Sequence, residues 1–251
     1  MNADKYRPRL EAPNSSFLNR PTGQSKPPVT AAGVSCFIEA SLVLGITLDH
    51  AFASANMPSI SADEAPRLKP FVALAEKLGS FAGQLTDAAI TGIVIEYAGD
   101  VGEMNTRALT SAALSGVLAA QMGAINMVSA PIVAKERGIQ VDEVKQTRRG
   151  AYGTYMRITV KTAEYERSVA GTVFTDGKPR IIQVKGIELE SDFGKHMLYI
   201  TNNDRPGFIG NIGTLMGNAG INIACFHFGR VEAGGDAIGL VEVDAAVPQS
   251  V

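Results

Sequence analysis

The sequence predicts an α+β protein with two successive small domains and without a Rossmann domain. Residues 196–243 read as strand, Pro-Gly turn, helix, strand, hairpin and strand. Between residues 56 and 190, helical segments precede a run of strand-like segments, which is typical of an α+β fold. A dinucleotide-binding domain requires a G-x-G-x-x-G turn between a strand and a helix, and the chain contains no such motif.

Composition excludes several classes of protein. The chain has 251 residues, 45% of them hydrophobic, which is enough for two small cores and a tail. Its formal net charge of −2 gives no attraction to nucleic acid or to a membrane surface. The two cysteines, Cys36 and Cys225, have no metal-ligand spacing around them. We therefore expect a cytoplasmic protein with no metal site.

Residues 1–54 differ from the rest of the chain. Prolines among polar residues predict a poorly ordered or remnant segment at the start. The apolar run 34–48 is too short to cross a bilayer, and Glu39 interrupts it.

The first predicted domain covers residues 55–192. Ser61 and Glu64 have the spacing of a capping box ahead of a helix over Phe71–Leu85. Asp176-Gly177 predicts the hairpin between the last two strands. The other predicted elements are the strand Ile90–Tyr97, the helices Arg107–Met122 and Asn126–Arg137, and the strands Val141–Thr147, Tyr155–Thr162, Tyr165–Phe174 and Arg180–Leu189.

The second predicted domain covers residues 193–251. Its strands are predicted at Met197–Ile200, Ile221–Phe228 and Ala237–Val243. Between the first two, Pro206 is expected near the first turn of a helix, and Gly217 and Gly220 can cap the end of that helix. The helix carries one apolar face, made by Phe208, Ile209, Ile212, Leu215 and Met216.

A signature spans the first turn, the helix and the second strand of this domain. It consists of Asn203-Asp204-Arg205-Pro206-Gly207, then Gly210, Gly213 and Gly217, then Gly220-Ile221-Asn222-Ile223. With it the segment resembles the ACT domain, a βαββαβ fold that senses amino acids. The family holds its ligand at the turn before the first helix, often across a subunit boundary, where backbone N–H groups and the helix dipole attract a carboxylate.

The resemblance implies an effector site made of Asn202, Asp204, Gly207 and Asn222. Asp204 would accept the ammonium group of L-serine or a similar amino acid, and the two asparagines would add hydrogen bonds. The alternative is that Asp204 caps the helix and that Asn222 occupies a turn.

An ACT domain also has a second helix and a fourth strand, and Asp244–Val251 is too short for both. We expect this ACT-like domain to be incomplete at its C-terminus. Its exposed sheet edge predicts a homo-oligomer formed by pairing of ACT units.

Four motifs in the first domain point to one family. They are ANMPSISADEAPRLKPF at 55–71, LGSFAGQLTD at 78–87, NMVSAPIVAKERGI at 126–139 and TDGKPRIIQVKGI at 175–187. In this order, and followed by the ACT-like segment, they resemble the C-terminal regulatory half of the D-3-phosphoglycerate dehydrogenase family. That half consists of an allosteric substrate-binding domain and an ACT domain.

Complete members of this family are NAD-dependent enzymes that open serine biosynthesis. Residues 1–54 cannot hold their catalytic and nucleotide-binding domains, and none of His50, His196 and His227 follows a Rossmann unit. We therefore expect no catalytic residue, no cofactor and no hydride transfer from this chain alone.

The resemblance also implies an anion site in the first domain. Basic residues fall on the late strands and turns, and Arg180, with Lys178 beside it, best matches a phosphate-binding role. Ile187 and Asp192 stand where some members carry Arg. The alternative is a solvated strand face. The other basic residues considered are Arg148, Arg149 and Arg157.

The predicted function is therefore that of a regulatory fragment that binds L-serine or a similar amino acid. Three alternatives remain open. The chain could be a sensor that acts in trans on a full-length dehydrogenase, the regulatory half of a serine dehydratase, or a non-functional gene remnant. A serine dehydratase needs a Cys-ligated iron–sulfur domain, which two cysteines do not supply.

Overall fold

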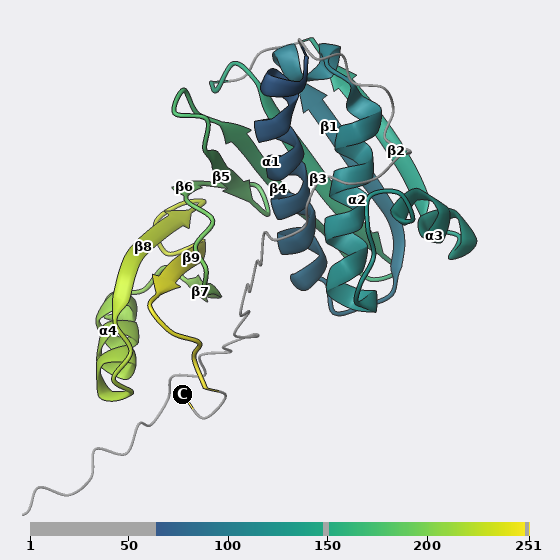
Figure 1. Cartoon of the computed structure of the whole chain (residues 1–251). Helices are drawn as coiled ribbons and strands as arrows, with labels where there is room; N and C mark the ends of the chain where they lie inside the picture. Colours follow the sequence, from purple (N-terminus) through teal and green to yellow (C-terminus); the bar gives the residue numbers. More distant parts are fainter. Residues whose placement is uncertain (1–63, 148–150, 249–250) are drawn as a thin grey trace, which may run out of the picture. The chain divides into compact units, whose positions relative to one another are not determined.

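The computed structural model describes residues 64–147, 151–248 and 251, which all belong to one compact unit. Two sheets follow one another along the chain (Figure 1). The first has six strands in the order β2-β1-β3-β4-β5-β6, and the second has three in the order β7-β9-β8. The predicted α+β class is confirmed. No Rossmann domain is evident among these described residues.

The six-stranded sheet is antiparallel except at one edge, where β1 and β2 run parallel. Because parallel neighbours need a crossover, the chain between β1 and β2 forms helices that return across the sheet. The strands are β1 (Ile90–Ala98), β2 (Gln140–Gln146), β3 (Tyr155–Thr162), β4 (Glu166–Val173), β5 (Pro179–Val184) and β6 (Ile187–Ser191).

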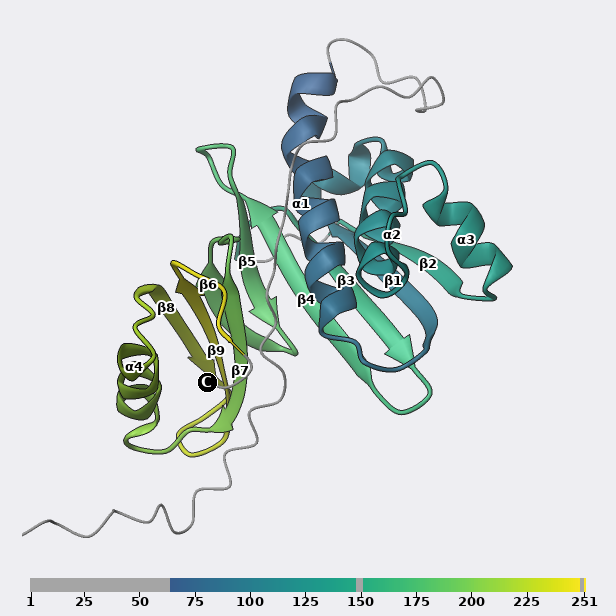
Figure 2. The ribbon, with the colours of Figure 1, turned by 60° about the horizontal axis from the view of Figure 1, so that its bottom comes forward.

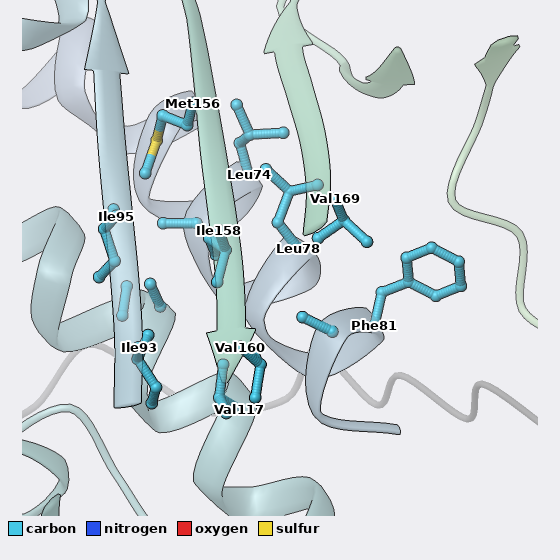
Figure 3. Close-up of a cluster of buried hydrophobic side chains, with 14 of the residues drawn as sticks. Leu74, Leu78, Phe81, Ile93, Ile95, Val117, Met156, Ile158, Val160 and Val169 are labelled. Carbon is cyan, nitrogen blue, oxygen red and sulfur yellow. The ribbon is translucent and has the colours of Figure 1, made fainter. Parts of the chain in front are cut away.

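Helices cover one face of this sheet, and none of the described helices lies on the opposite face (Figures 1 and 2). The helical elements are α1 (Ala65–Gln84), η1 (Gly99–Glu103), α2 (Thr106–Met122) and α3 (Ala130–Glu136). Leu74, Leu78 and Phe81 of α1 are buried against strand residues such as Ile158 (Figure 3). Burial of such side chains stabilises the fold by about 1.5–3 kcal/mol each.

The two long helices approach each other closely because small residues meet at their contact. A Cβ atom added to Gly79 would lie 2.2 Å from the carbonyl oxygen of Ala113, and one added to Gly116 would lie 2.3 Å from that of Glu76. Side chains at these glycines would force the helices apart.

The first helix begins earlier than predicted. The predicted start was Phe71, but α1 starts at Ala65 and so includes Pro66 and Pro70. Pro66 lies in the first turn, where a missing N–H costs nothing, and Pro70 follows little more than one turn later. Ser61 lies outside the described residues. Glu64 occupies the N-cap position, and its Oε1 accepts a hydrogen bond from the Asn105 N–H at 3.2 Å.

The predicted strand Arg180–Leu189 is in fact two strands, β5 and β6. Val184 pairs with Ile187 across the two-residue turn Lys185-Gly186, whose residues both have positive φ, 50° and 81°. Such a turn fits the twist of a hairpin. The hairpin predicted at Asp176-Gly177 is present between β4 and β5.

The three-stranded sheet has β9 (Asp236–Val243) at its centre, flanked by β7 (Met197–Asn203) and β8 (Ile223–Arg230). One helix, α4 (Phe208–Asn218), is described in this part of the chain. Its Ile212 and Met216 pack on Leu198 and Val241, whereas Ile209 of the predicted apolar face is exposed. Val247 and Val251 pack against the same cluster.

The other face of the small sheet packs toward the first core. The rings of Phe81 and Tyr199 meet edge to face, with centroids 6.2 Å apart. Strand β8 also approaches β6, because a Cβ on Gly229 would lie 2.5 Å from the carbonyl oxygen of Glu188. Gly229 therefore permits this approach.

Helix α4 ends in a Schellman motif. Gly220, with φ of 69°, follows the C-cap Ala219, and the N–H of Ile221 reaches the carbonyl of Met216 at 2.9 Å. The predicted capping role of Gly220 fits this geometry, whereas Gly217, the other predicted cap, lies within the helix. Within the described residues, no helix is both long enough and apolar enough to span a membrane.

Candidate functional site

Polar groups gather where β7 ends and α4 begins. Asn202 on β7 and Arg230 on β8 both pair with Ala237 on the central strand, so the three residues form one row across the sheet. Residues in one row point to the same face. Alternation along β7 places Asn202 on the face that carries Leu198, Ile200 and α4.

Asp204 follows directly after this strand and has two donors. Arg230 donates to Oδ2 of Asp204, and the backbone N–H of Gly234, in the β8–β9 hairpin, donates to the same oxygen at 3.3 Å. The Arg230 hydrogen bond, and secondly the one from Gly234, lower the pKa of Asp204 below its ordinary value. Asp204 is therefore a carboxylate at neutral pH.

The side-chain amide of Asn202 has no hydrogen-bond partner among the described residues. Its Nδ2 and Oδ1 are both buried. A buried amide without partners is costly, by roughly 1–3 kcal/mol for each group. Nδ2 can donate and Oδ1 can accept hydrogen bonds, and neither is used by a group within residues 64–147, 151–248 and 251.

The N-terminus of α4 follows Asp204 closely in the chain and has no capping side chain. Gly207 is its N-cap residue, with φ of 89°, and no side chain caps the helix. Pro206 lies before the cap and thus just outside the helix, not in its first turn. The first N–H groups of α4 therefore present partial positive charge without a side-chain acceptor. Asp204 does not cap the helix, because its carboxylate is engaged by Arg230 and Gly234.

Asn222 lies at the opposite end of the helix. It follows the C-terminus of α4, and its Nδ2 donates to Oδ2 of Asp244 at 2.8 Å. The neighbouring pair Ile223 and Val243 is at the far end of the sheet from the Asn202 row. Eleven helical residues span about 16 Å. One copy of the chain therefore brings Asn202, Asp204 and Gly207 together, but not Asn222.

At the predicted anion site, the arginine is already paired with carboxylates. Arg180 on β5 contacts two carboxylates, Asp192 at 2.5 Å and Asp176 at 3.4 Å, and its guanidinium lies over the ring of Phe174. Lys178 is exposed in the adjacent turn. Two carboxylates already offset the charge of Arg180, which lowers its attraction for a phosphate. The site of Arg180 and Lys178 stays a prediction.

Among the described residues, Arg157 is engaged by side chains of β1 and β5 other than Arg180. Arg157 on β3 pairs with Glu96 at 2.9 Å and donates to Gln183 at 3.0 Å. Arg148 and Arg149 lie outside the described residues, as do the predicted N-terminal segment 1–54 and Cys36. Residues 64–147, 151–248 and 251 contain no group of three or more His, Cys, Asp or Glu side chains that could hold a metal ion.

Sequence reasoning missed Arg230 and Gly234. The hairpin signal at residues 234–236 could have paired Arg230 with Ala237. No local signal predicts that Asn202 also pairs with Ala237, because this contact joins residues far apart in the chain.

Comparison with known proteins gives a consistent result. Residues 67–185 match the family model described as "D-3-phosphoglycerate dehydrogenase intervening domain". A protein of Methanocaldococcus jannaschii named D-3-phosphoglycerate dehydrogenase is 35% identical over 197 residues, which are 78% of this chain and 37% of that protein. The protein of the same name from Synechocystis is 34% identical, over 77% of this chain and 35% of that protein. The one from Bacillus subtilis is 32% identical, over 75% of this chain and 36% of that protein.

The chain thus spans little more than a third of the length of these curated relatives. The aligned third is their C-terminal part. With 197 residues, the alignment is longer than the family model's match at 67–185.

Proposed function

Because the chain contains the intervening domain and C-terminal region of the D-3-phosphoglycerate dehydrogenase family, we propose that it is a regulatory part of such an enzyme. In this proposal it binds L-serine or a similar small amino acid at the turn between β7 and α4. The observation that carries the proposal is the buried Asn202 amide, which has no hydrogen-bond partner in the described part of the chain. It lies close to the ionised Asp204 and to the start of α4, which has no capping side chain.

Each part of an α-amino acid has a complementary group here. The α-carboxylate fits the N–H groups that follow Gly207, since the helix dipole favours an anion at this end. The ammonium group fits Asp204, whose ionised oxygen Arg230 occupies in the free chain. The Asn202 amide supplies the remaining donor and acceptor.

The ligand therefore competes with Arg230 for Asp204. The side chain of Arg230 is 52% exposed, so it can move away into water at little cost. Displacement of Arg230 by the ammonium keeps the charge balance at Asp204.

A second copy of the chain completes the site. Asn222 lies about 16 Å along α4 from Gly207, so it contributes only if a neighbouring copy brings its own Asn222 to this turn. Ile209 and Val231 flank the turn and are 54% and 70% exposed. Exposed apolar side chains next to a polar site favour an interface between copies. We propose a homo-oligomer that binds the amino acid at this interface.

Complete family members use NAD, and we assign no NAD site to the described residues. None of their turns carries the G-x-G-x-x-G sequence that approaches a pyrophosphate. An assay of NAD reduction with 3-phosphoglycerate tests this directly. Turnover by the purified chain would contradict the proposal of a purely regulatory role.

Calorimetry with L-serine tests the effector site. We expect saturable heat with the wild-type chain, and at least a tenfold loss of affinity for Asn202→Ala and for Asp204→Asn, on the order of 1.4 kcal/mol or more. Asn218→Ala, on the exposed end of α4, is the matched control and should bind as the wild type does. Absence of heat and of a thermal shift at millimolar L-serine and L-alanine would overturn the proposal.

A further inference from the structure

Strand β2 forms an edge of the six-stranded sheet, and among the described residues nothing pairs with its outer side. The opposite edge strand, β6, differs because β8 lies against it. Most residues of β2 are exposed on both faces. An open strand edge of this kind presents unpaired N–H and C=O groups to another chain.

We infer that β2 pairs antiparallel with β2 of a second copy, with Val144 facing Val144 on the twofold axis. The two six-stranded sheets would then continue as one, with their helices on the same face. This interface is separate from the effector site and does not depend on the proposed function.

The order of charges on β2 favours this register, which is the one that places opposite charges across the interface. Glu143 and Lys145 flank Val144 and point to the helix-covered face, because Thr110 of α2 donates to Oε1 of Glu143 at 2.5 Å. With Val144 on the axis, Glu143 of each copy faces Lys145 of the other. Shifting the axis to Glu143 or to Lys145 would place like charges directly opposite each other, which is destabilising.

The charged groups are available for this pairing. Lys145 makes no ion pair with any residue in 64–147, 151–248 or 251. The hydrogen bond from Thr110 holds the Glu143 carboxylate in place on the same face. Charges on an edge strand usually oppose association, but here their sequence is self-complementary in one alignment.

One exposed apolar residue also belongs to this edge. Val144 is 39% exposed, and alternation along β2 places it on the sheet face opposite to Glu143 and Lys145. With Val144 on the axis, the two valines would contact each other across the interface and remove apolar surface from water.

Disulfide trapping in the full chain tests the register. In a Cys36→Ser/Cys225→Ser background, Val144→Cys should form an intermolecular disulfide under mild oxidation, because facing residues of antiparallel strands have Cα atoms about 4.5–5.5 Å apart. Gln146→Cys is the control. Its two copies would stand about 13 Å apart in this register and should not crosslink.

Charge exchange tests the pairing without cysteine. Glu143→Lys and Lys145→Glu should each weaken self-association at this edge on the order of tenfold, measured by sedimentation, since each creates two like-charge pairs. A mixture of the two variants restores opposite charges across the interface and should associate as the wild type does. Glu164→Lys, in the exposed β3–β4 turn, should have no effect.

Circular dichroism establishes that each variant is folded. The proposal is overturned if Val144→Cys stays uncrosslinked while folded, or if the two charge variants associate no better when mixed than alone. Association that survives every β2 variant would place the interface elsewhere, including the small sheet.

Discussion

Asn202 and Arg230 lie in one row of the three-stranded sheet, on either side of Ala237. Arg230 reaches from this row to Asp204, while the Asn202 amide has no hydrogen-bond partner among the described residues. At this end of the sheet, a paired carboxylate therefore lies close to a buried amide that is unpaired within the described structure. Our proposal assigns that amide to the amino-acid ligand.

The Arg230–Asp204 pair predicts a pH-dependent stability. Because the pKa of Asp204 is lowered in the folded chain, its contribution is present above the ordinary Asp value of 3.8 and is lost as the pH falls through the folded value. We expect Arg230→Ala to destabilise the chain at pH 7 and to approach wild-type stability near pH 2, in urea titrations. An equal difference at both pH values would contradict this assignment.

The buried hydroxyl of Tyr97 predicts the opposite pH dependence. Burial raises the pKa of Tyr97, whose hydroxyl is 2.7 Å from that of Thr110. Stability should be intact below about pH 10 and fall as the pH rises above it. Tyr97→Phe should cost about 1 kcal/mol at pH 7 and should flatten the alkaline loss in thermal unfolding. If the ultraviolet absorbance of tyrosinate shows that every tyrosine of the folded chain ionises near pH 10, the raised pKa of Tyr97 is contradicted.

The close approach of β8 to β6 predicts that Gly229 is sensitive to substitution. Gly229→Ala places a methyl group against the backbone of Glu188 and should destabilise the chain by about 1–3 kcal/mol in urea unfolding. Gly217→Ala is the matched control, since a Cβ there meets nothing within 4 Å. It lies in α4 and should be neutral or stabilising by up to about 1 kcal/mol. Equal effects at both positions would show that β8 does not pack on β6.

The carboxylates around Arg180 predict weak anion binding. Removing them with Asp176→Asn/Asp192→Asn frees the guanidinium, so inorganic phosphate should bind at least tenfold more tightly than to the wild type. Calorimetry with phosphate measures this, and adding Lys178→Ala to the double variant shows whether the exposed lysine contributes. Unchanged phosphate affinity after removal of both carboxylates would exclude Arg180 as an anion site.

Much of the local structure could be predicted from the sequence. Helix α2 follows from a long run of strong helix formers and begins one residue from its predicted start. The β4–β5 hairpin follows from Asp176-Gly177. The Lys185-Gly186 turn was missed because a lysine with positive φ is uncommon, which left β5 and β6 as one predicted strand.

The sequence alone determined the order of elements and the turn before α4, because periodicity and turn chemistry act over a few residues. It also showed that the chain has no G-x-G-x-x-G motif. Tertiary structure decided which distant side chains meet. It joined Arg230 to Asp204 and Asp192 to Arg180, and it set Asn222 apart from Asn202 at the other end of α4. Strand register and helix length fix such distances, and neither can be predicted from the few residues next to a given position.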